Sequence, residues 1–377
     1  MKNPITLFIF TLTLLLPACG DSLTGVVDQQ DALIKLRLLE GSPTLAQKMR
    51  GIWIIGGLYG NSIGTAIPQV DLYDPDTDTW FPSITSIPYP VSFASATSVN
   101  SNIYVIGGFR SDGTVAILAQ EYNILSNTWT LKSTTGFTAK ANVLGVVSDN
   151  KIYILGGSTG IASAAWGGTQ NTQNYNPADD SWVSLLATTL PAVGTERFVL
   201  SYNGVIYHMG GRITNATTFS ATHDGYTCSS NANTSTAETV LLNPPNQRTG
   251  IAGAVYQYIN GTVRVFIAGG ITALTGCTGN YILQSTTAIT TQSAFQYISN
   301  PFTGAWANAT ALPQAIGFSS AVVKGGYLYV FGGIQSISSF SAKTYCISLD
   351  PLGAAWDQTK VDMPIARYGH SAVVINQ

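Results

Sequence analysis

Six basic residues recur along the chain and could form one binding surface. The sequence of 377 residues contains 17 Lys plus Arg against 19 Asp plus Glu, so these six are a large share of its cations. Arginine presents a planar fork of donors that pairs with acidic groups in two places at once. Gathered together, such residues would bind a carboxylate, a sulfate or a sialic acid. The predicted ligand-binding residues are Arg110, Lys140, Arg197, Arg212, Arg248 and Arg367.

A second candidate chemistry is proton transfer. Glu196 with Arg197, or Glu196 with His370, could form an acid/base pair if the fold placed them together. The other two histidines give less support, because His208 lies in an apolar run where a buried structural role is expected and His223 falls in an irregular loop. No phosphate-binding loop is present. No catalytic residue is therefore predicted.

Metal-binding patterns are incomplete. Asp74, Asp76 and Asp78 resemble the start of a calcium loop, but that loop needs Gly at its sixth position and Glu at its twelfth. This chain has Thr79 and Thr85 there. A Pro-Asp turn between two strands explains these residues better. We predict neither a metal nor another cofactor.

Four cysteines are present, and three different roles are predicted for them. Cys228 and Cys277 lie in loop-rich stretches and form the candidate disulfide, with two unrelated free thiols as the alternative. Cys346, beside Tyr345, is expected to be a small buried apolar residue. Cys19 belongs to the N-terminal segment considered below.

All these residues must be positioned by a repeated unit. The unit is an apolar run that ends in Gly-Gly, followed by a polar loop, an aromatic residue, a turn and a Trp. An apolar run without alternation predicts a strand buried on both faces, and the paired glycines suit a strand end that needs positive φ or a close backbone approach. The runs end, about 50 to 60 residues apart, at Gly57, Gly108, Gly157, Gly211, Gly270 and Gly333. The second halves run from Tyr73 to Trp80, Tyr122 to Trp129, Tyr175 to Trp182, Tyr297 to Trp306 and, more loosely, from Ser348 to Trp356.

This pattern resembles the kelch repeat family, whose period of roughly 50 residues builds four-stranded blades of a β-propeller. The resemblance implies an all-β, six-bladed propeller over residues 51–377. From the channel outward, the Gly-Gly run would be the second strand, the Tyr segment the third and the Trp segment the fourth. It also implies that the six basic residues ring one mouth of the channel together with Phe93 and Phe318. The alternative is that these cations hydrogen-bond backbone carbonyls between blades.

One unit departs from the pattern, and the two ends of the chain are incomplete. After Gly211, residues 213–239 are rich in Ser, Thr and Asn; we expect residues 240–242 to form the outer strand and leave the third strand open. Residues 363–375 resemble an inner strand without a Gly-Gly strand after it, whereas residues 51–57 lack an inner strand before them. We therefore predict that the C-terminal strand lies beside the N-terminal one and closes the ring, which removes exposed sheet edges.

The N-terminus resembles a bacterial lipoprotein signal peptide. Lys2 precedes an apolar stretch that is too short for a stable transmembrane helix, and the sequence Leu-Pro-Ala-Cys follows. The resemblance implies that residues 1–18 are removed and that Cys19 carries the lipid. Pro17 departs from the usual residue at its position, so plain secretion is the alternative.

The segment after the cysteine is expected to be a tether. It covers residues 19–50 and includes a candidate short helix at residues 31–40, which is too short to be stable alone in water. Gly20 replaces the Asp of the inner-membrane retention signal, so we expect an outer-membrane or cell-surface location.

The net charge of −2 excludes a typical nucleic-acid binder, which needs a basic stripe. We predict a monomeric cell-envelope lipoprotein that holds a protein, peptide or acidic glycan on the propeller mouth without catalysis and touches the membrane only through its lipid. The alternative is a carbohydrate-active enzyme that resembles the bacterial N-acetylneuraminate epimerases. A third hypothesis is a structural spacer in an envelope complex.

Overall fold

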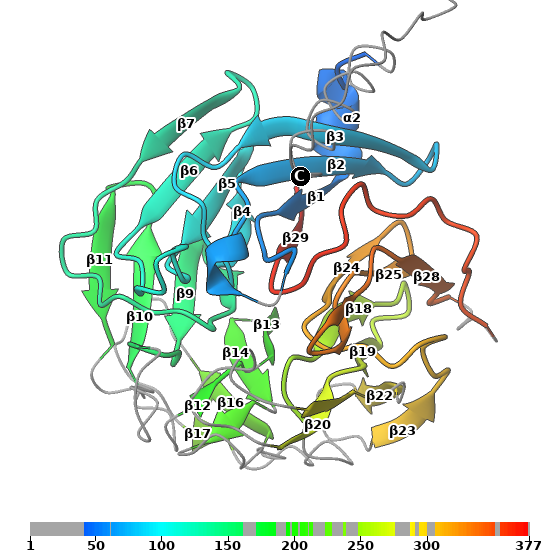
Figure 1. The fold of residues 1–377 in the computed structure, drawn as a ribbon. Coiled ribbons are helices and arrows are strands. Elements are labelled where there is room, and N and C mark those ends of the chain that lie inside the picture. Colours follow the sequence, from blue (N-terminus) through cyan, green and yellow to red (C-terminus); the bar gives the residue numbers. More distant parts are fainter. Residues whose placement is uncertain are drawn as a thin grey trace, which may run out of the picture.

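The computed structural model describes residues 41–60, 62–160, 171–185, 194–196, 198–202, 204–209, 211–213, 223–227, 237–238, 248–275, 287–290, 294–299, 306–350 and 355–375. The predicted signal peptide, Cys19, Arg197, the candidate disulfide of Cys228 and Cys277 and the candidate helix at residues 31–40 lie outside these residues. The described part is an all-β propeller. Its antiparallel sheets are arranged around a common centre (Figure 1).

Each large sheet, which we call a blade, runs from an inner strand to an outer strand. The first blade is β29 (Ser371–Val374), β1 (Ile52–Ile55), β2 (Gln69–Asp74) and β3 (Thr79–Ser86). The next two are β4 (Ser95–Val99), β5 (Asn102–Ile106), β6 (Ala119–Asn123) and β7 (Thr128–Leu131), then β8 (Gly145–Ser148), β9 (Lys151–Leu155), β10 (Thr172–Asn176) and β11 (Ser181–Ser184). As predicted, the Gly-Gly runs are second strands and the Tyr and Trp segments follow outward.

The remaining blades follow the same plan. They are β13 (Phe198–Tyr202), β14 (Val205–Met209), β16 (His223–Thr227) and β17 (Ala237–Glu238); β18 (Ala252–Gln257), β19 (Val263–Ala268), β22 (Ala294–Ser299) and β23 (Trp306–Ala309); and β24 (Ser320–Lys324), β25 (Tyr327–Phe331) and β28 (Thr344–Ser348). Small two-stranded sheets pair β12 (Gly194–Thr195) with β15 (Arg212–Ile213), β20 (Ile271–Thr275) with β21 (Thr287–Thr290), and β26 (Ile334–Ser336) with β27 (Ser339–Phe340). A short 3-10 helix, η1, covers Ile63–Thr65.

The two ends of the chain meet in the first blade. Strand β29 pairs antiparallel with β1, so that Val374 lies opposite Ile52 and Ser371 opposite Ile55. The innermost strands also touch one another in a cycle that runs β29, β4, β8, β13, β18, β24 and back to β29. The predicted pairing of the last strand with the first is therefore present, and β1 has a partner on both edges.

Pairs of aromatic residues pack between the third and fourth strands of the blades. Tyr73 lies directly opposite Trp80 across β2 and β3, with ring centroids 4.9 Å apart, and the same pairing recurs in the next two blades. The Tyr73 hydroxyl donates to Asp78 Oδ1 at 2.7 Å, and Asp78 occupies the turn with a positive φ of 52°. The predicted turn role of this aspartate is confirmed. Cys346 is a buried free thiol in β28, also as predicted.

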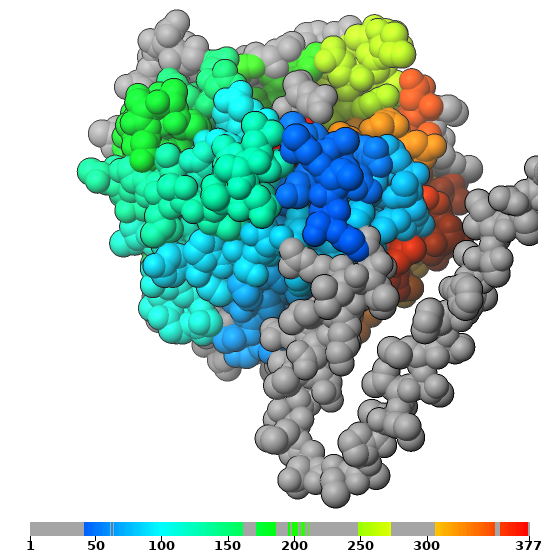
Figure 2. Space-filling view, turned by 90° about the horizontal axis from the view of Figure 1, so that it is seen from above, coloured from blue at the N-terminus to red at the C-terminus, as the bar shows by residue number. Residues whose placement is uncertain are grey.

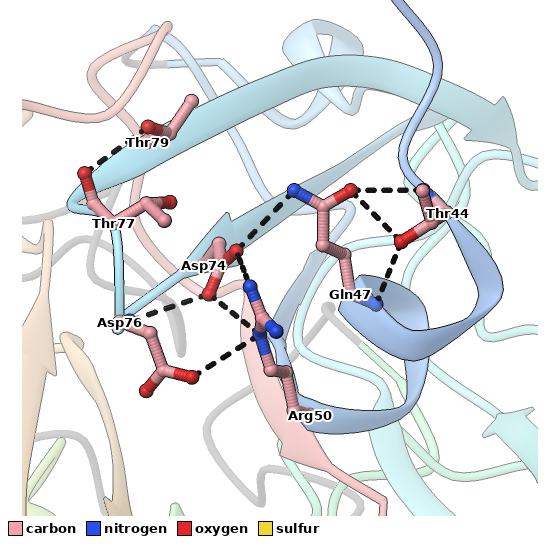
Figure 3. A network of polar contacts seen from close by, with 7 residues as sticks. All are labelled: Thr44, Gln47, Arg50, Asp74, Asp76, Thr77 and Thr79. Atoms are coloured by element: carbon pink, nitrogen blue, oxygen red, sulfur yellow. Dashed lines mark hydrogen bonds and ion pairs between the residues drawn. The ribbon is translucent and has the colours of Figure 1, made fainter.

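A short helix, α2 (Leu45–Arg50), packs on the first blade. Thr44 and Gln47 close its first turn as a capping box. Arg50 holds Asp74 at the end of β2 with an Nη2 to Oδ2 distance of 2.6 Å and reaches Asp76 through Nε at 3.2 Å (Figure 3). In the space-filling view the dark blue atoms of this part of the chain lie at the surface, in contact with lighter blue neighbours (Figure 2). Residues 45–50, at the end of the predicted tether, thus form a helix that contacts β2.

Two further predictions need correction in the irregular blade. His223, expected in a loop, begins strand β16, which supplies the third strand that the sequence left open. The outer strand is β17 at Ala237–Glu238, earlier than predicted, and residues 240–242 lie outside the described part. Among the described helices, none has the length and apolar character needed to cross a membrane.

Candidate functional site

The connections into the inner strands and those that leave the Gly-Gly strands meet at one end of the channel, which we call the mouth. A backbone bridge joins the two kinds of connection at equivalent places around the ring. The bridged pairs are Leu58 with Tyr368, Ser92 with Phe109, Ala141 with Ser158, Thr195 with Arg212, Thr249 with Ile271, and Gly317 with Ile334. The repeated sequence pattern thus gives one repeated backbone arrangement around the mouth.

Directly after each bridged residue of the inner connection, one residue adopts the left-handed conformation. Positive φ is uncommon for residues other than glycine, so a non-glycine side chain there is held by its surroundings. We call this set the mouth ring. It consists of Phe93 (φ 52°), Asn142 (53°), Glu196 (59°), Gly250 (60°), Phe318 (52°) and Gly369 (60°).

Backbone hydrogen bonds join neighbouring members of the mouth ring. In five places the backbone N–H of one member donates to the carbonyl of the preceding member. The bonds are Phe93 to Gly369 at 2.8 Å, Asn142 to Phe93 at 3.0 Å, Glu196 to Asn142 at 3.0 Å, Phe318 to Gly250 at 2.9 Å and Gly369 to Phe318 at 3.1 Å. Between Glu196 and Gly250 a side chain contributes, since Thr249 Oγ1 donates to Glu196 Oε2 at 2.6 Å. The frame is repetitive, whereas the side chains that it presents differ from blade to blade.

Two connected cavities lie inside the ring. The upper cavity, of about 70 Å³, is lined by the whole mouth ring together with Ser319 and His370. The lower cavity, of about 170 Å³, is lined by residues further along the inner strands and shares Leu144, Ile251, Ser319 and His370 with the upper one. The two form a channel that begins at the mouth.

Several buried polar atoms in this channel have no hydrogen-bond partner. Both amide atoms of Asn142 and the Ser319 hydroxyl are unpaired, and these residues are only 5% and 8% exposed. Burial, and to a lesser extent the charge of Arg367, lower the pKa of His370 to about 3, whereas a hydrogen bond with the Phe331 backbone opposes this shift. His370 is therefore neutral at physiological pH.

Two phenylalanines also line the upper cavity. The Phe93 and Phe318 rings meet edge to face with centroids 5.2 Å apart. A Cβ at Gly369 would come within 2.6 Å of the Phe93 ring, and one at Gly250 within 2.9 Å of the Phe318 ring. Glycine at these two positions therefore leaves the space that the phenylalanines fill.

The predicted cations Lys140, Arg248 and Arg367 each lie two residues before a mouth-ring residue, and all three are fully buried. Lys140 Nζ donates to the Asn171 carbonyl at 2.8 Å, and Arg248 Nη1 donates to the Gly269 carbonyl at 2.9 Å. Burial lowers the pKa of Lys140 to about 7 and that of Arg248 to about 10. Each of these two bonds joins the side chain to a carbonyl of the blade whose inner strand follows it in sequence.

The structure therefore corrects the predicted basic ring at these three positions. Arg367 pairs with buried Asp71 and donates to the Gly56 carbonyl at 3.2 Å. As in the structural alternative, the three cations donate to backbone carbonyls, but the bonds lie within one blade rather than between blades. Arg110 is half-buried beside Asp112, whose pKa is lowered mainly by hydrogen bonds from Thr114. Arg197 and the side chain of Arg212 lie outside the described part, so their role stays a prediction.

The structure brings together other residues that the sequence did not combine into a site. The sequence placed Phe93 and Phe318 at the mouth and paired Glu196 with Arg197 or His370, whereas Asn142 and Ser319 were missed. The sequence held a signal for these positions, because each mouth-ring residue stands two or three residues before an inner strand. Asn142 follows Lys140 by the same spacing that places Gly369 after Arg367.

Comparisons with known proteins agree with the repeat. A family model described as Kelch motif matches residues 90–135, which include the β4–β7 blade. The chain is 23% identical to Kelch-like protein 23 of Homo sapiens over 334 residues, which is 86% of this chain and 50% of that protein. It is 32% identical to Kelch-like protein terF of Aspergillus terreus over 148 residues, 37% of this chain and 31% of that protein.

A solved structure has a similar fold. The structure titled "Structure of YjhT" aligns with a TM-score of 0.63 and 14% sequence identity, and the alignment covers 84% of this chain and 98% of that one. At this identity the likeness concerns the fold alone. The chain spans about half the length of the human relative, so that protein's partners are not transferred to it.

Proposed function

Since this chain belongs to the kelch repeat β-propeller family, we propose that it is a binding module that holds a protein or peptide partner on the mouth of a closed, six-bladed ring, without catalysis. The cycle of inner strands and the equivalent mouth-ring residues support the blade number. A rigid frame that presents variable side chains suits recognition, since little order is lost on binding.

The observation that carries this proposal is a group of exposed apolar side chains around the mouth. Tyr59 is 43% exposed, Ile117 54% and Leu144 36%. Tyr59 follows the bridged residue Leu58, Ile117 lies in the loop after β5, and Leu144 lines both cavities. Aromatic and apolar side chains of this kind are enriched at the centres of protein interfaces.

The proposed setting is the cell envelope. The signal-peptide resemblance of residues 1–18 and the cysteine at position 19 support a lipid anchor, and Gly20 favours the outer membrane or the cell surface. Two or three acyl chains would anchor the protein stably, whereas one would hold it only marginally. The protein would act there as a monomer.

A catalytic alternative has one observation in its favour. Glu196 and His370, which the sequence suggested as an acid/base pair, line the same upper cavity. Burial lowers the pKa of His370 to about 3, so this imidazole is a poor proton donor near neutral pH. We therefore rank an epimerase-like activity on an acidic sugar second, and a purely structural spacer third.

Binding to peptide and glycan arrays tests the proposal. We expect Tyr59→Ser and Ile117→Ser to weaken binding of a peptide hit by about tenfold each, as loss of an interface anchor does. The matched control is Leu125→Ser, because Leu125 is 63% exposed in the β6–β7 turn, away from the mouth. Equal losses in all three variants would contradict a mouth site. Turnover of an acidic sugar would favour the enzyme, and no binding at all would favour the spacer.

A further inference from the structure

The propeller has a second end, opposite the mouth, which we call the far end. It is formed by the turns that join the first strand of a blade to the second and the third strand to the fourth. Ile259, in the turn between β18 and β19, is the most exposed large apolar side chain of the described part, at 101%. Tyr327, directly after the equivalent turn of the next blade, is 44% exposed. Partner binding on the mouth leaves both side chains unused.

The hairpin that carries Ile259 is longer than its counterparts. Strands β18 and β19 pair over six residues each, whereas the pairs of first and second strands in the other blades extend over five or fewer. The β18–β19 turn has five residues, and the equivalent turns have two. Since every first strand begins two or three residues after the mouth ring, the extra length lies at the far end. The tip with Ile259 therefore extends beyond the neighbouring turns.

Contacts with the next blade hold this hairpin in place. The Tyr258 hydroxyl donates to the Leu349 carbonyl at 2.7 Å, and the Leu349 N–H donates to the Gly326 carbonyl at 2.9 Å. The rings of Tyr256 and Tyr258 meet edge to face with centroids 4.7 Å apart, and the Arg264 guanidinium lies 4.8 Å from the centre of the Tyr258 ring. A side chain presented by an ordered hairpin loses little conformational freedom when it is buried against another surface.

The N-terminal part of the chain reaches the propeller at the same end. Strand β1 runs toward the mouth, so helix α2, which precedes it, lies at the far end. Arg50 of this helix pairs with Asp74, the last residue of β2. Lys48 Nζ donates at 2.9 Å to Asn127 in the β6–β7 turn, which also belongs to the far end. A lipid on Cys19 would therefore be attached to the far end and not to the mouth.

The chemistry of the far end suits a lipid surface. Tyrosine collects at the boundary between membrane and water, and an aliphatic side chain gains free energy when it enters the acyl region. Leu45 of α2 and Leu125 of the turn that α2 contacts are also exposed there, at 51% and 63%. The charges near the hairpin have both signs, since Arg264 and Lys324 lie on its side of the propeller together with Asp350. Apolar contact, and not a net charge, would therefore bring this end to a membrane.

We propose that the far end faces the membrane, with Ile259 and Tyr327 in contact with the lipid interface beside the anchor, and that the mouth points away from it. The inference rests on the cell-envelope setting of the proposed function and adds which side of the propeller meets the lipid. A mouth with this orientation stays open to a protein or peptide partner.

Reporter groups on the full-length chain test this orientation. Ile259→Cys and Ile117→Cys are matched, because both isoleucines are exposed in connections at opposite ends of the propeller. Each variant is labelled with an environment-sensitive fluorophore, and the unaltered chain, treated in the same way, gives the background from its own cysteines. The chain is bound through its N-terminal segment to vesicles of phosphatidylethanolamine and phosphatidylglycerol. We expect the emission of the label at position 259 to shift to the blue and to rise, and that of the label at position 117 to stay unchanged.

Serine variants give a second readout. Loss of a buried isoleucine in Ile259→Ser should speed the transfer of the protein between vesicles about tenfold. The same variant should bind a peptide hit as the unaltered chain does. Ile117→Ser should show the reverse, with weaker peptide binding and unchanged transfer between vesicles.

Four results would overturn the inference. A label at position 259 that still reports water on bound vesicles would show that the far end does not touch lipid, while the envelope setting would stand. A blue shift at position 117 instead would show that the mouth faces the membrane. Weaker peptide binding in Ile259→Ser would assign the hairpin to a protein partner. A chain that does not bind vesicles at all would remove the envelope setting together with the inference, and peptide binding on the mouth would still be measured separately.

Discussion

The first blade and the β8–β11 blade hold a buried cation at the same position in different ways. In the first blade Arg367 pairs with Asp71, and both side chains are fully buried. Before β8, the equivalent Lys140 donates to the Asn171 carbonyl at 2.8 Å, and no carboxylate of the described part pairs with it. One cation is thus compensated by a charge and the other by a backbone dipole.

The two blades also differ in how the chain builds them. The first blade joins the two ends of the propeller, and Arg367 and Asp71 are 296 positions apart in sequence. The β8–β11 blade is one continuous segment, so none of its strands comes from the other end of the chain. We infer that the stronger pairing lies where sequence neighbours cannot hold the sheet.

Removing residues 363–377 is the most severe way to test this comparison. The deletion removes β29, Arg367 and the contacts of β29 with β4 and β24. We expect the whole propeller to lose cooperative thermal unfolding, followed by circular dichroism. Removing only residues 376–377 is the control and should leave the melt unchanged. A truncated protein that melts like the full chain would show that β29 does not hold the ring.

Asp71→Asn tests the ion pair alone. The substitution leaves Arg367 buried without a compensating charge, which typically costs about 3–5 kcal/mol of unfolding free energy. Urea unfolding measures the loss. Asp76→Asn is the matched control, because Asp76 is 67% exposed, and its surface ion pair should contribute less than about 1 kcal/mol. Equal losses of unfolding free energy in the two variants would mean that the buried ion pair contributes no more stability than the exposed one.

Lys140→Met, unlike Asp71→Asn, should not destabilise the protein near neutral pH. Burial lowers the pKa of Lys140 to about 7, whereas the unfolded chain protonates it below about 10.5. The unfolded state therefore binds more protons between these values, and the stability of the unaltered protein rises with pH in this window. At pH 7 burial of the charged lysine still lowers the free energy of unfolding by nearly its full amount. We therefore expect Lys140→Met to leave the free energy of unfolding unchanged or to raise it at this pH.

The measurement for Lys140 is urea unfolding of both proteins from pH 7 to pH 10. The unaltered protein should gain about 3 kcal/mol relative to Lys140→Met over this range, from the shift of the lysine alone. A difference that does not change with pH would show that the lysine is not desolvated in the folded state.

The sequence predicted the parts of the fold that repeat. Gly-Gly runs, Tyr–Trp pairs and the pairing of the last strand with the first follow from patterns that the blades share. The candidate site was less accessible, because it depends on where single side chains point. Lys140 and Arg367 look like exposed loop cations in sequence, and only the folded blades show that their charges are buried. The role of Asn142 appears once the mouth ring is assembled.

Helix α2 was missed for a related reason. Six residues are too few to predict a helix from periodicity, and its stability comes from packing on the first blade and from the bonds between Arg50 and Asp74. Long-range contacts of this kind leave no local pattern in the sequence.

Arg50→Ala is expected to have the smallest effect, confined to this helix. Arg50 is 39% exposed, so its pair with Asp74 is partly screened by solvent, and global unfolding should be unchanged. Amide exchange of Lys48 and Gly51, which donate to Thr44 and Gln47, should become faster. Burial would raise the pKa of Asp74, but the bonds from Arg50 and from the Asp76 amide outweigh it and hold that pKa below its ordinary value. The pair therefore stabilises the helix above about pH 4 and is lost as Asp74 is protonated, so the exchange difference between the two proteins should fade in acid. If it persists at pH 2, Arg50 acts by packing rather than by charge.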